Sequence, residues 1–161
     1  MSSPSSFKSR GWVFFNQWCA MADVHEPEIR SYNMSRIRSK DTRPEILVRN
    51  FLYSKGFRYR LNDKKLPGKP DIVFRKYKAV IFVNGCFWHG HEHCRFFRIP
   101  KTNTKWWHNK IRRNINNDIE QAKKLKGMGF ELIVVWECEL KPDKRSETLE
   151  KIEKQLMRRR Q

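Results

Sequence analysis

The chain has 161 residues, enough for one domain with one hydrophobic core, and its 35 lysines and arginines against 17 acidic residues give a net charge of +18. No apolar stretch approaches the roughly 20 residues needed to span a bilayer, which argues against a membrane protein. Aromatic residues make up 13% of the chain, and basic charge mixed with aromatic rings favours nucleic acid as the partner. The alternatives are that the positive charge serves only to keep the protein soluble, or that it binds an anionic membrane surface.

The first 41 residues differ from the rest of the chain. Residues 2–9 are rich in serine and a short apolar patch follows at 12–15, so we expect Met21 to be the natural start and residues 1–20 to be a non-native or disordered extension. Residues 21–41 are polar and basic and contain Met34. This composition predicts an arm that wraps DNA, and a flexible terminus without a function is the alternative.

A helix is predicted from Thr42, because Glu45 follows three residues later as in a capping box, and Gly56 is a typical helix stop. Its apolar face holds Leu47, Val48, Phe51 and Leu52. Short strands are predicted at 57–61 and 71–74, and the apolar run 79–83 predicts a buried central strand. The long loop 84–104, rich in histidine, cysteine and aromatic residues, is typical of a functional or metal-held segment.

A long helix follows, and its predicted face is marked by Trp107, Ile111, Ile115, Ile119 and Ala122. It ends near residues 127–129, before a second buried strand at 131–136 that should pair in parallel with the first. Residues 146–160 predict an amphipathic basic helix. We expect an α/β fold with a mixed central sheet flanked by helices, in one domain over residues 42–161.

The segment 85–94 predicts a structural zinc site. Zinc prefers four tetrahedral nitrogen or sulfur ligands, which Cys86, Cys94, one histidine and Cys138 beyond the second buried strand could supply. His91 is the better histidine, because His93 adjoins Cys94 and leaves little slack. Disulfides are the alternative, but cysteines beside histidines suit a reducing cytosol and a metal.

Asp71 follows Pro70 at the start of a strand, where metal-dependent nucleases place a carboxylate that holds Mg²⁺ against the scissile phosphate. The usual acidic residue, spacer and lysine are absent from the next strand, which ends at Val83 and Asn84. His89, in the loop directly after that strand, is therefore the candidate acid or base.

These segments resemble one known family. The runs 66–71 (LPGKPD), 80–89 (VIFVNGCFWH) and 134–138 (VVWEC), with residues 22–25, 41–45, 100–102 and Trp107, are similar to the very-short-patch-repair (Vsr) DNA endonucleases over about residues 21–140. The resemblance implies a restriction-endonuclease-like fold. It also implies nicking of one strand 5′ of the thymine at T:G mismatches, which arise when 5-methylcytosine deaminates.

The resemblance also implies roles for single residues. Asp71 would be the principal Mg²⁺ ligand with the backbone carbonyl of Val83, and His89 would activate water. Glu45 and Asp118 would support the metal-bound water, although Glu45 could serve only as a helix cap and Asp118 only as a solvated carboxylate. The DNA-binding residues would be Phe87, Trp88 and Trp107 as a wedge in the base stack, with Met34 and Lys69. Core packing is the alternative for Trp107.

One departure from the family is Asn84, where many members carry histidine. Asparagine cannot titrate, so it could hydrogen-bond a phosphate oxygen but not move a proton.

The expected partner is double-stranded DNA with a T:G mismatch, with mismatch-repair proteins as further candidates and no membrane. We expect a monomer, since no strong apolar stripe is left exposed, and a cytoplasmic location with action at the nucleoid. The alternatives are a non-catalytic, zinc-stabilised binder of distorted duplex, or a related nuclease of different specificity. Asp71, His89 and Asp118 separate the enzyme from the binder, which needs none of them.

Overall fold

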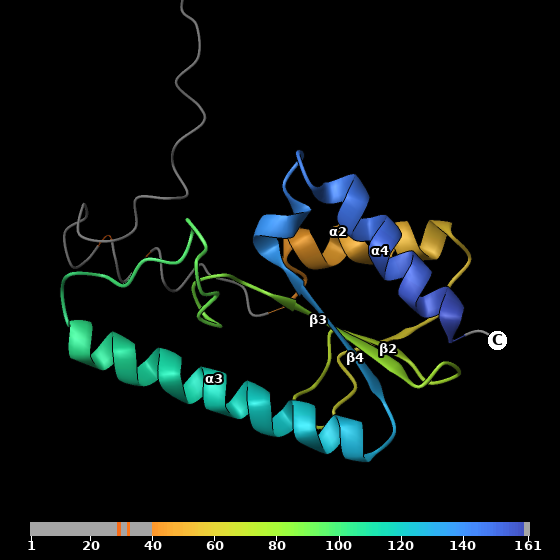
Figure 1. Ribbon diagram of the computed structural model, residues 1–161, viewed down its shortest axis with the longest axis horizontal. Coiled ribbons are helices and arrows are strands. Elements are labelled where there is room, and N and C mark those ends of the chain that lie inside the picture. Colours follow the sequence, from red (N-terminus) through yellow and green to blue (C-terminus); the bar gives the residue numbers. More distant parts are fainter. Residues whose placement is uncertain (1–28, 30–31, 33–39, 160–161) are drawn as a thin grey trace, which may run out of the picture.

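A computed structural model describes residues 29, 32 and 40–159 (Figure 1). The predicted extension at 1–20, nearly all of the arm at 21–41, and Met34 lie outside the described residues. The elements are, in chain order, α2 (Arg43–Ser54), β1 (Arg60–Leu61), β2 (Ile72–Phe74), β3 (Ala79–Asn84), α3 (Thr104–Gly127), β4 (Glu131–Trp136), the 3₁₀ helix η1 (Glu137–Leu140) and α4 (Arg145–Arg158). Among these helices, none is both long and apolar enough to cross a membrane.

The four strands form one mixed sheet in the order β1-β2-β3-β4. β2 pairs antiparallel with both β1 and β3, whereas β3 and β4 are parallel and place Ile81 opposite Ile133. The crossover between the parallel strands is the long helix α3, as a parallel connection requires. The predicted mixed sheet and its parallel pair are confirmed.

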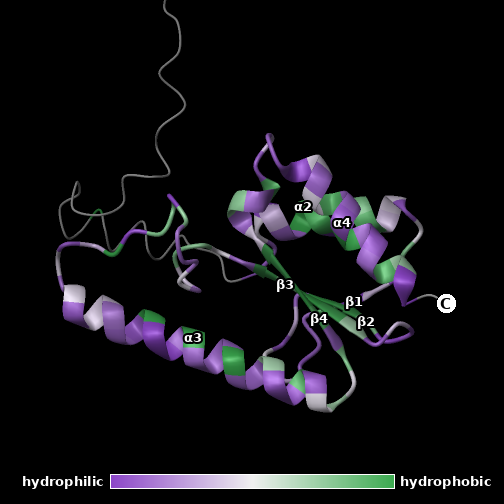
Figure 2. Cartoon of the chain, viewed as in Figure 1, coloured by the Kyte–Doolittle hydropathy of each residue, from purple (hydrophilic) through white to green (hydrophobic). Residues whose placement is uncertain are grey.

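Helices cover both faces of the sheet, with α2 and α4 on one side and α3 on the other (Figure 1). Because strand side chains alternate, Ile72, Phe74 and Ile81 pack toward α2 and α4, while Val73 and Val80 pack with Leu125 of α3. Figure 2 shows the strands as the most hydrophobic part of the fold. The sheet therefore supplies most of the hydrophobic core, with helices packed on both faces.

The predicted helix starts are close to those observed, but one predicted helix face is partly wrong. Thr42 caps α2 through its Oγ1, which accepts the N–H of Glu45 at 3.5 Å. In α3, Ile111 is buried but Ile119 is 50% exposed. The predicted face follows residues four positions apart, and four residues advance about 400° around a helix. Each step therefore turns the side chain by about 40° from the previous one, so that Ile119 no longer faces the core. Leu125 takes its place in the core.

Candidate active site and metal-ligand cluster

Asp71 lies directly before β2, beside the end of β3. The backbone N–H of Val83 donates to its Oδ2 at 2.8 Å, which fixes the carboxylate against the neighbouring strand. Burial, helped by the nearby Glu45 carboxylate, raises the pKa of Asp71 to about 6, although the Val83 hydrogen bond and the cationic Arg49 oppose the shift. A partly desolvated carboxylate beside a second one is a good site for a cation.

Glu45 is 4% exposed and uses both carboxylate oxygens. Oε1 accepts the hydroxyl of Thr42 at 2.8 Å, and Oε2 accepts the N–H of Asp41 at 3.1 Å and Nη2 of Arg49 at 2.7 Å. Glu45 therefore serves as a helix cap and also contributes negative charge near Asp71. The two roles weighed for it from the sequence are compatible.

Arg49 is a buried cation that the sequence analysis did not single out. It is 6% exposed, pairs with Glu45 and Asp41, and leaves its Nε without a hydrogen-bond partner among the described residues. A signal was present, because residues 45, 48, 49 and 52 lie on the same face of a helix and all four are buried. Arg49 compensates part of the negative charge of the site.

His89 and Asp118 form the second half of the site. Nδ1 of His89 lies 2.6 Å from Oδ2 of Asp118, 29 positions away in the sequence. Asp118 is seven residues from both Ile111 and Leu125, so it shares their helix face and points toward the sheet side. With Nδ1–H donating to the carboxylate, the other ring nitrogen of His89 is left as an acceptor, as a general base requires.

The loop that carries His89 is fixed by its own turns and by α3. The N–H of His89 donates to Gly85 at 3.2 Å, and Nδ2 of Asn114 in α3 donates to the carbonyl of Trp88 at 2.9 Å. Gly90 has a φ of 61° and lies so close to α3 that a Cβ there would be 2.6 Å from Cδ1 of Ile115. The loop is thus docked against the helix that supplies Asp118.

Four ligand atoms converge on the other side of this loop. One ligand atom each from Cys86, His91, Cys94 and Cys138 lies within 4.8 Å of the others. The parallel register explains half of the cluster, because residues 84 and 136 are opposite each other and Cys86 and Cys138 each lie two residues further on. Burial raises the pKa of the Cys86 and Cys138 thiols. A Cys₃His set of this kind could hold a metal ion.

The choice of histidine follows from the packing. The ring of His91 stacks on Trp136 with centroids 4.0 Å apart, and its Nδ1 lies 3.4 Å from Sγ of Cys138. His93 is exposed, has a left-handed φ of 58°, and is not in the group. The structure therefore brings His91 rather than His93 to the cysteines.

The three aromatic residues expected to form the wedge are in contact. The ring centroids of Phe87 lie 5.2 Å from those of both Trp88 and Trp107, and the two tryptophans are 6.0 Å apart. All three are only partly buried. Asn84 is 8% exposed at the end of β3, and Lys69 is exposed in the turn before Asp71.

Comparisons with known proteins find one family model and several relatives that match the chain. A sequence profile of the DNA mismatch endonuclease Vsr family matches residues 22–95. The type II nicking enzyme V.NmeAIP of Neisseria meningitidis serogroup A is 54% identical over 121 residues, which cover 75% of this chain and 86% of the relative. The DNA mismatch endonuclease Vsr of Escherichia coli K12 is 42% identical over 121 residues, 75% of this chain and 77% of the relative. Both relatives are therefore matched over most of their own length and over most of this chain.

Proposed function

Because the chain belongs to the DNA mismatch endonuclease Vsr family, we propose that it nicks one DNA strand at T:G mismatches, 5′ of the thymine, with Mg²⁺ as its cofactor. Family membership makes the chain a DNA-hydrolysing enzyme with a restriction-endonuclease-like fold. The observation that carries the mechanism is the partly buried Asp71 carboxylate near the oriented His89–Asp118 pair. A DNA-binding module without catalysis has no use for this arrangement.

Asp71 would hold Mg²⁺ through its carboxylate, together with the backbone carbonyl of Val83. Magnesium prefers oxygen ligands, and a carboxylate whose pKa is raised by burial gains from a cation beside it. The bound ion would supply stabilisation of the charge that develops on the phosphate. Glu45 would take part through water held near Asp71, while remaining the cap of α2.

His89 would take the proton of the attacking water at the ring nitrogen that Asp118 leaves available. The Asp118 carboxylate at 2.6 Å orients the imidazole and would stabilise the imidazolium that forms. Asn84 lies at the end of β3 and cannot titrate, so its role would be a hydrogen bond to a phosphate oxygen. One histidine then carries the proton transfer.

Zinc is the metal we propose for the Cys₃His cluster, because thiolate and imidazole ligands in a group of four are typical of structural zinc. Its role would be to fix the loop 85–94, which carries the wedge residues Phe87 and Trp88 and the base His89. The charge of +18 and the exposed Lys69 suit duplex DNA. We propose a cytoplasmic monomer acting on chromosomal DNA, with mismatch-repair proteins as candidate partners.

A nicking assay on end-labelled duplexes with one T:G mismatch, with and without Mg²⁺, tests this function. The informative variant is Asp71→Asn, and Asp143→Asn, which changes an exposed carboxylate in the same way, is the matched control. We expect Mg²⁺-dependent nicking by the parent and the control, and loss of it in Asp71→Asn. Nicking that survives in Asp71→Asn would refute the assigned site. A parent that binds the duplex but never cuts it would be the non-catalytic binder.

A further inference from the structure

Trp106 is an exposed aromatic residue for which the proposed mechanism has no use. It is 57% exposed, although burying a tryptophan in a core or interface is strongly favourable. Its ring meets that of Trp107 edge to face, with centroids 4.7 Å apart. Trp107 in turn contacts Phe87 and Trp88, so Trp106 continues the aromatic cluster of the wedge out to the surface.

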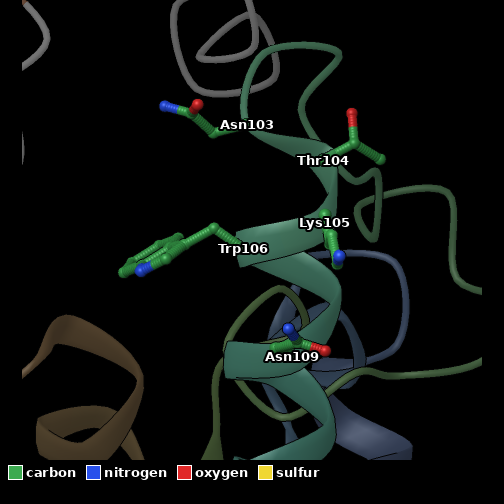
Figure 3. Close-up of a pocket in the computed structure, with 5 residues that line it drawn as sticks. All are labelled: Asn103, Thr104, Lys105, Trp106 and Asn109. Carbon is green, nitrogen blue, oxygen red and sulfur yellow. The ribbon is translucent and has the colours of Figure 1, made fainter.

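A surface pocket is lined by Asn103, Thr104, Lys105, Trp106 and Asn109 (Figure 3). The side chains of Asn103 and Trp106 project to the same side of α3 (Figure 3). Asn103 has a left-handed φ of 52°, and its side chain makes no capping hydrogen bond to the helix. Its amide is therefore available to a ligand, and an asparagine amide can donate and accept at the edge of a nucleobase.

The charge around this pocket suits a polyanion. Residues 101–117 contain three lysines, two arginines and no acidic residue. Lys105, Arg112 and Arg113 are exposed, and no ion pair among the described residues involves them. An exposed indole, an available amide and unpaired cations together match one nucleotide of a DNA strand, with its base, base edge and phosphate.

We propose that Trp106 forms a further DNA contact outside the three-residue wedge, in which a nucleobase near the mismatch stacks on its indole ring and meets the amide of Asn103. This inference rests on the proposed function, because it takes the neighbouring rings Phe87, Trp88 and Trp107 as the wedge. Trp106 is then a determinant of affinity for the nucleotides that flank the mismatch. Lys105, beside it, contacts a phosphate.

The test is a binding titration of fluorescent T:G duplexes with the parent protein, Trp106→Ala and Trp106→Phe. Loss of one stacked base weakens binding by about 5- to 150-fold, which is the effect expected for Trp106→Ala. Trp106→Phe keeps an aromatic face and should stay within roughly 5-fold of the parent. Met128→Ala is the matched control, since Met128 is a 47% exposed apolar residue at the far end of the same helix.

A second measurement separates stacking from an indirect effect on Trp107. Each nucleotide flanking the mismatch is replaced in turn by an abasic one. We expect one position to weaken binding by the parent but not by Trp106→Ala. Parental affinity in Trp106→Ala, or equal abasic effects in both proteins, would overturn the proposal. A parent that binds these duplexes without nicking them refutes the endonuclease function alone, because the binding comparison can still be made.

Discussion

Arg49→Met tests the buried ion pair that links α2 to the active site. The side chains of Arg49 and Glu45 are 8% and 6% exposed and lie 2.7 Å apart, so the variant leaves an uncompensated carboxylate in the core. Breaking such a pair costs about 3–5 kcal/mol. The second pair of Arg49, with Asp41, adds little because that aspartate is 61% exposed. The variant also removes the buried Nε of Arg49, which has no hydrogen-bond partner among the described residues, and this offsets part of the lost stability. We therefore expect Arg49→Met to lower the free energy of unfolding by about 3 kcal/mol.

Reversible urea unfolding, with a thermal melt beside it, measures this loss. For a protein of this length, about 3 kcal/mol corresponds to a decrease of roughly 6–12 °C in Tm. Adding Glu45→Gln to Arg49→Met removes both charges, and the two losses should be less than additive by about 1–3 kcal/mol. Lys55→Met is the control, since its pair with Glu153 is largely exposed and should contribute at most about 1 kcal/mol. If Arg49→Met lowers the free energy of unfolding no more than this control does, the buried Glu45 carboxylate does not need Arg49 to compensate its charge.

Four further variants probe the remaining contacts. Asp118→Asn should slow nicking by about 10- to 150-fold with little change in the Kd for DNA, because the variant weakens a charge-assisted hydrogen bond to His89. An unchanged nicking rate would contradict the role of Asp118 in orienting His89. Cys138→Ser should lose bound zinc by elemental analysis and melt earlier, and a full complement of zinc would remove Cys138 from the ligand set. Gly90→Ala, at a φ of 61° and against α3, should lower the free energy of unfolding by about 1–3 kcal/mol, and a parental unfolding curve would contradict the tight packing. Burial raises the folded-state pKa of Asp71 from 3.8 to about 6, so ionisation of this carboxyl destabilises the fold as the pH rises through about 6. Without Mg²⁺, Asp71→Asn should therefore melt at a higher temperature than the parent at pH 8, and this difference in Tm should shrink toward about pH 4. A difference in Tm that does not change with pH would contradict the raised pKa.

Much of the fold could be predicted because it follows from local rules. Thr42 followed by Glu45 is a capping pattern that acts within one helical turn, and in the structure Thr42 Oγ1 accepts the N–H of Glu45 while the Glu45 carboxylate accepts the Thr42 hydroxyl and the N–H of Asp41. The apolar runs at 79–83 and 131–136, separated by a long helix, required a parallel pair. That pair also explains why Cys138 meets Cys86 across 52 positions of sequence, since both follow strands that end at the same edge.

The parts that could not be predicted depend on burial and on long-range packing. Helix spacing places Arg49 on the buried face of α2, but charged residues usually lie outside, and only the folded site shows that Glu45 and Asp41 compensate its charge. Asp118 resembles any helix carboxylate in the sequence. Its contact with His89 exists because α3 docks on the loop through Gly90, a packing arrangement that no local pattern encodes.

The most direct measurement is the ratio of nicking rates on two duplexes that differ only in a T:G mismatch or a matched C:G pair, with the cut mapped on both strands in saturating Mg²⁺. A wedge of Phe87, Trp88 and Trp107 favours the weaker pair, because opening the base stack costs less there. We therefore expect a single nick 5′ of the mismatched thymine, at least about 10-fold faster than any cut in the matched duplex, since a difference of about 1.4 kcal/mol suffices. Equal rates on the two duplexes, or cuts on both strands, would contradict mismatch-directed nicking by this site.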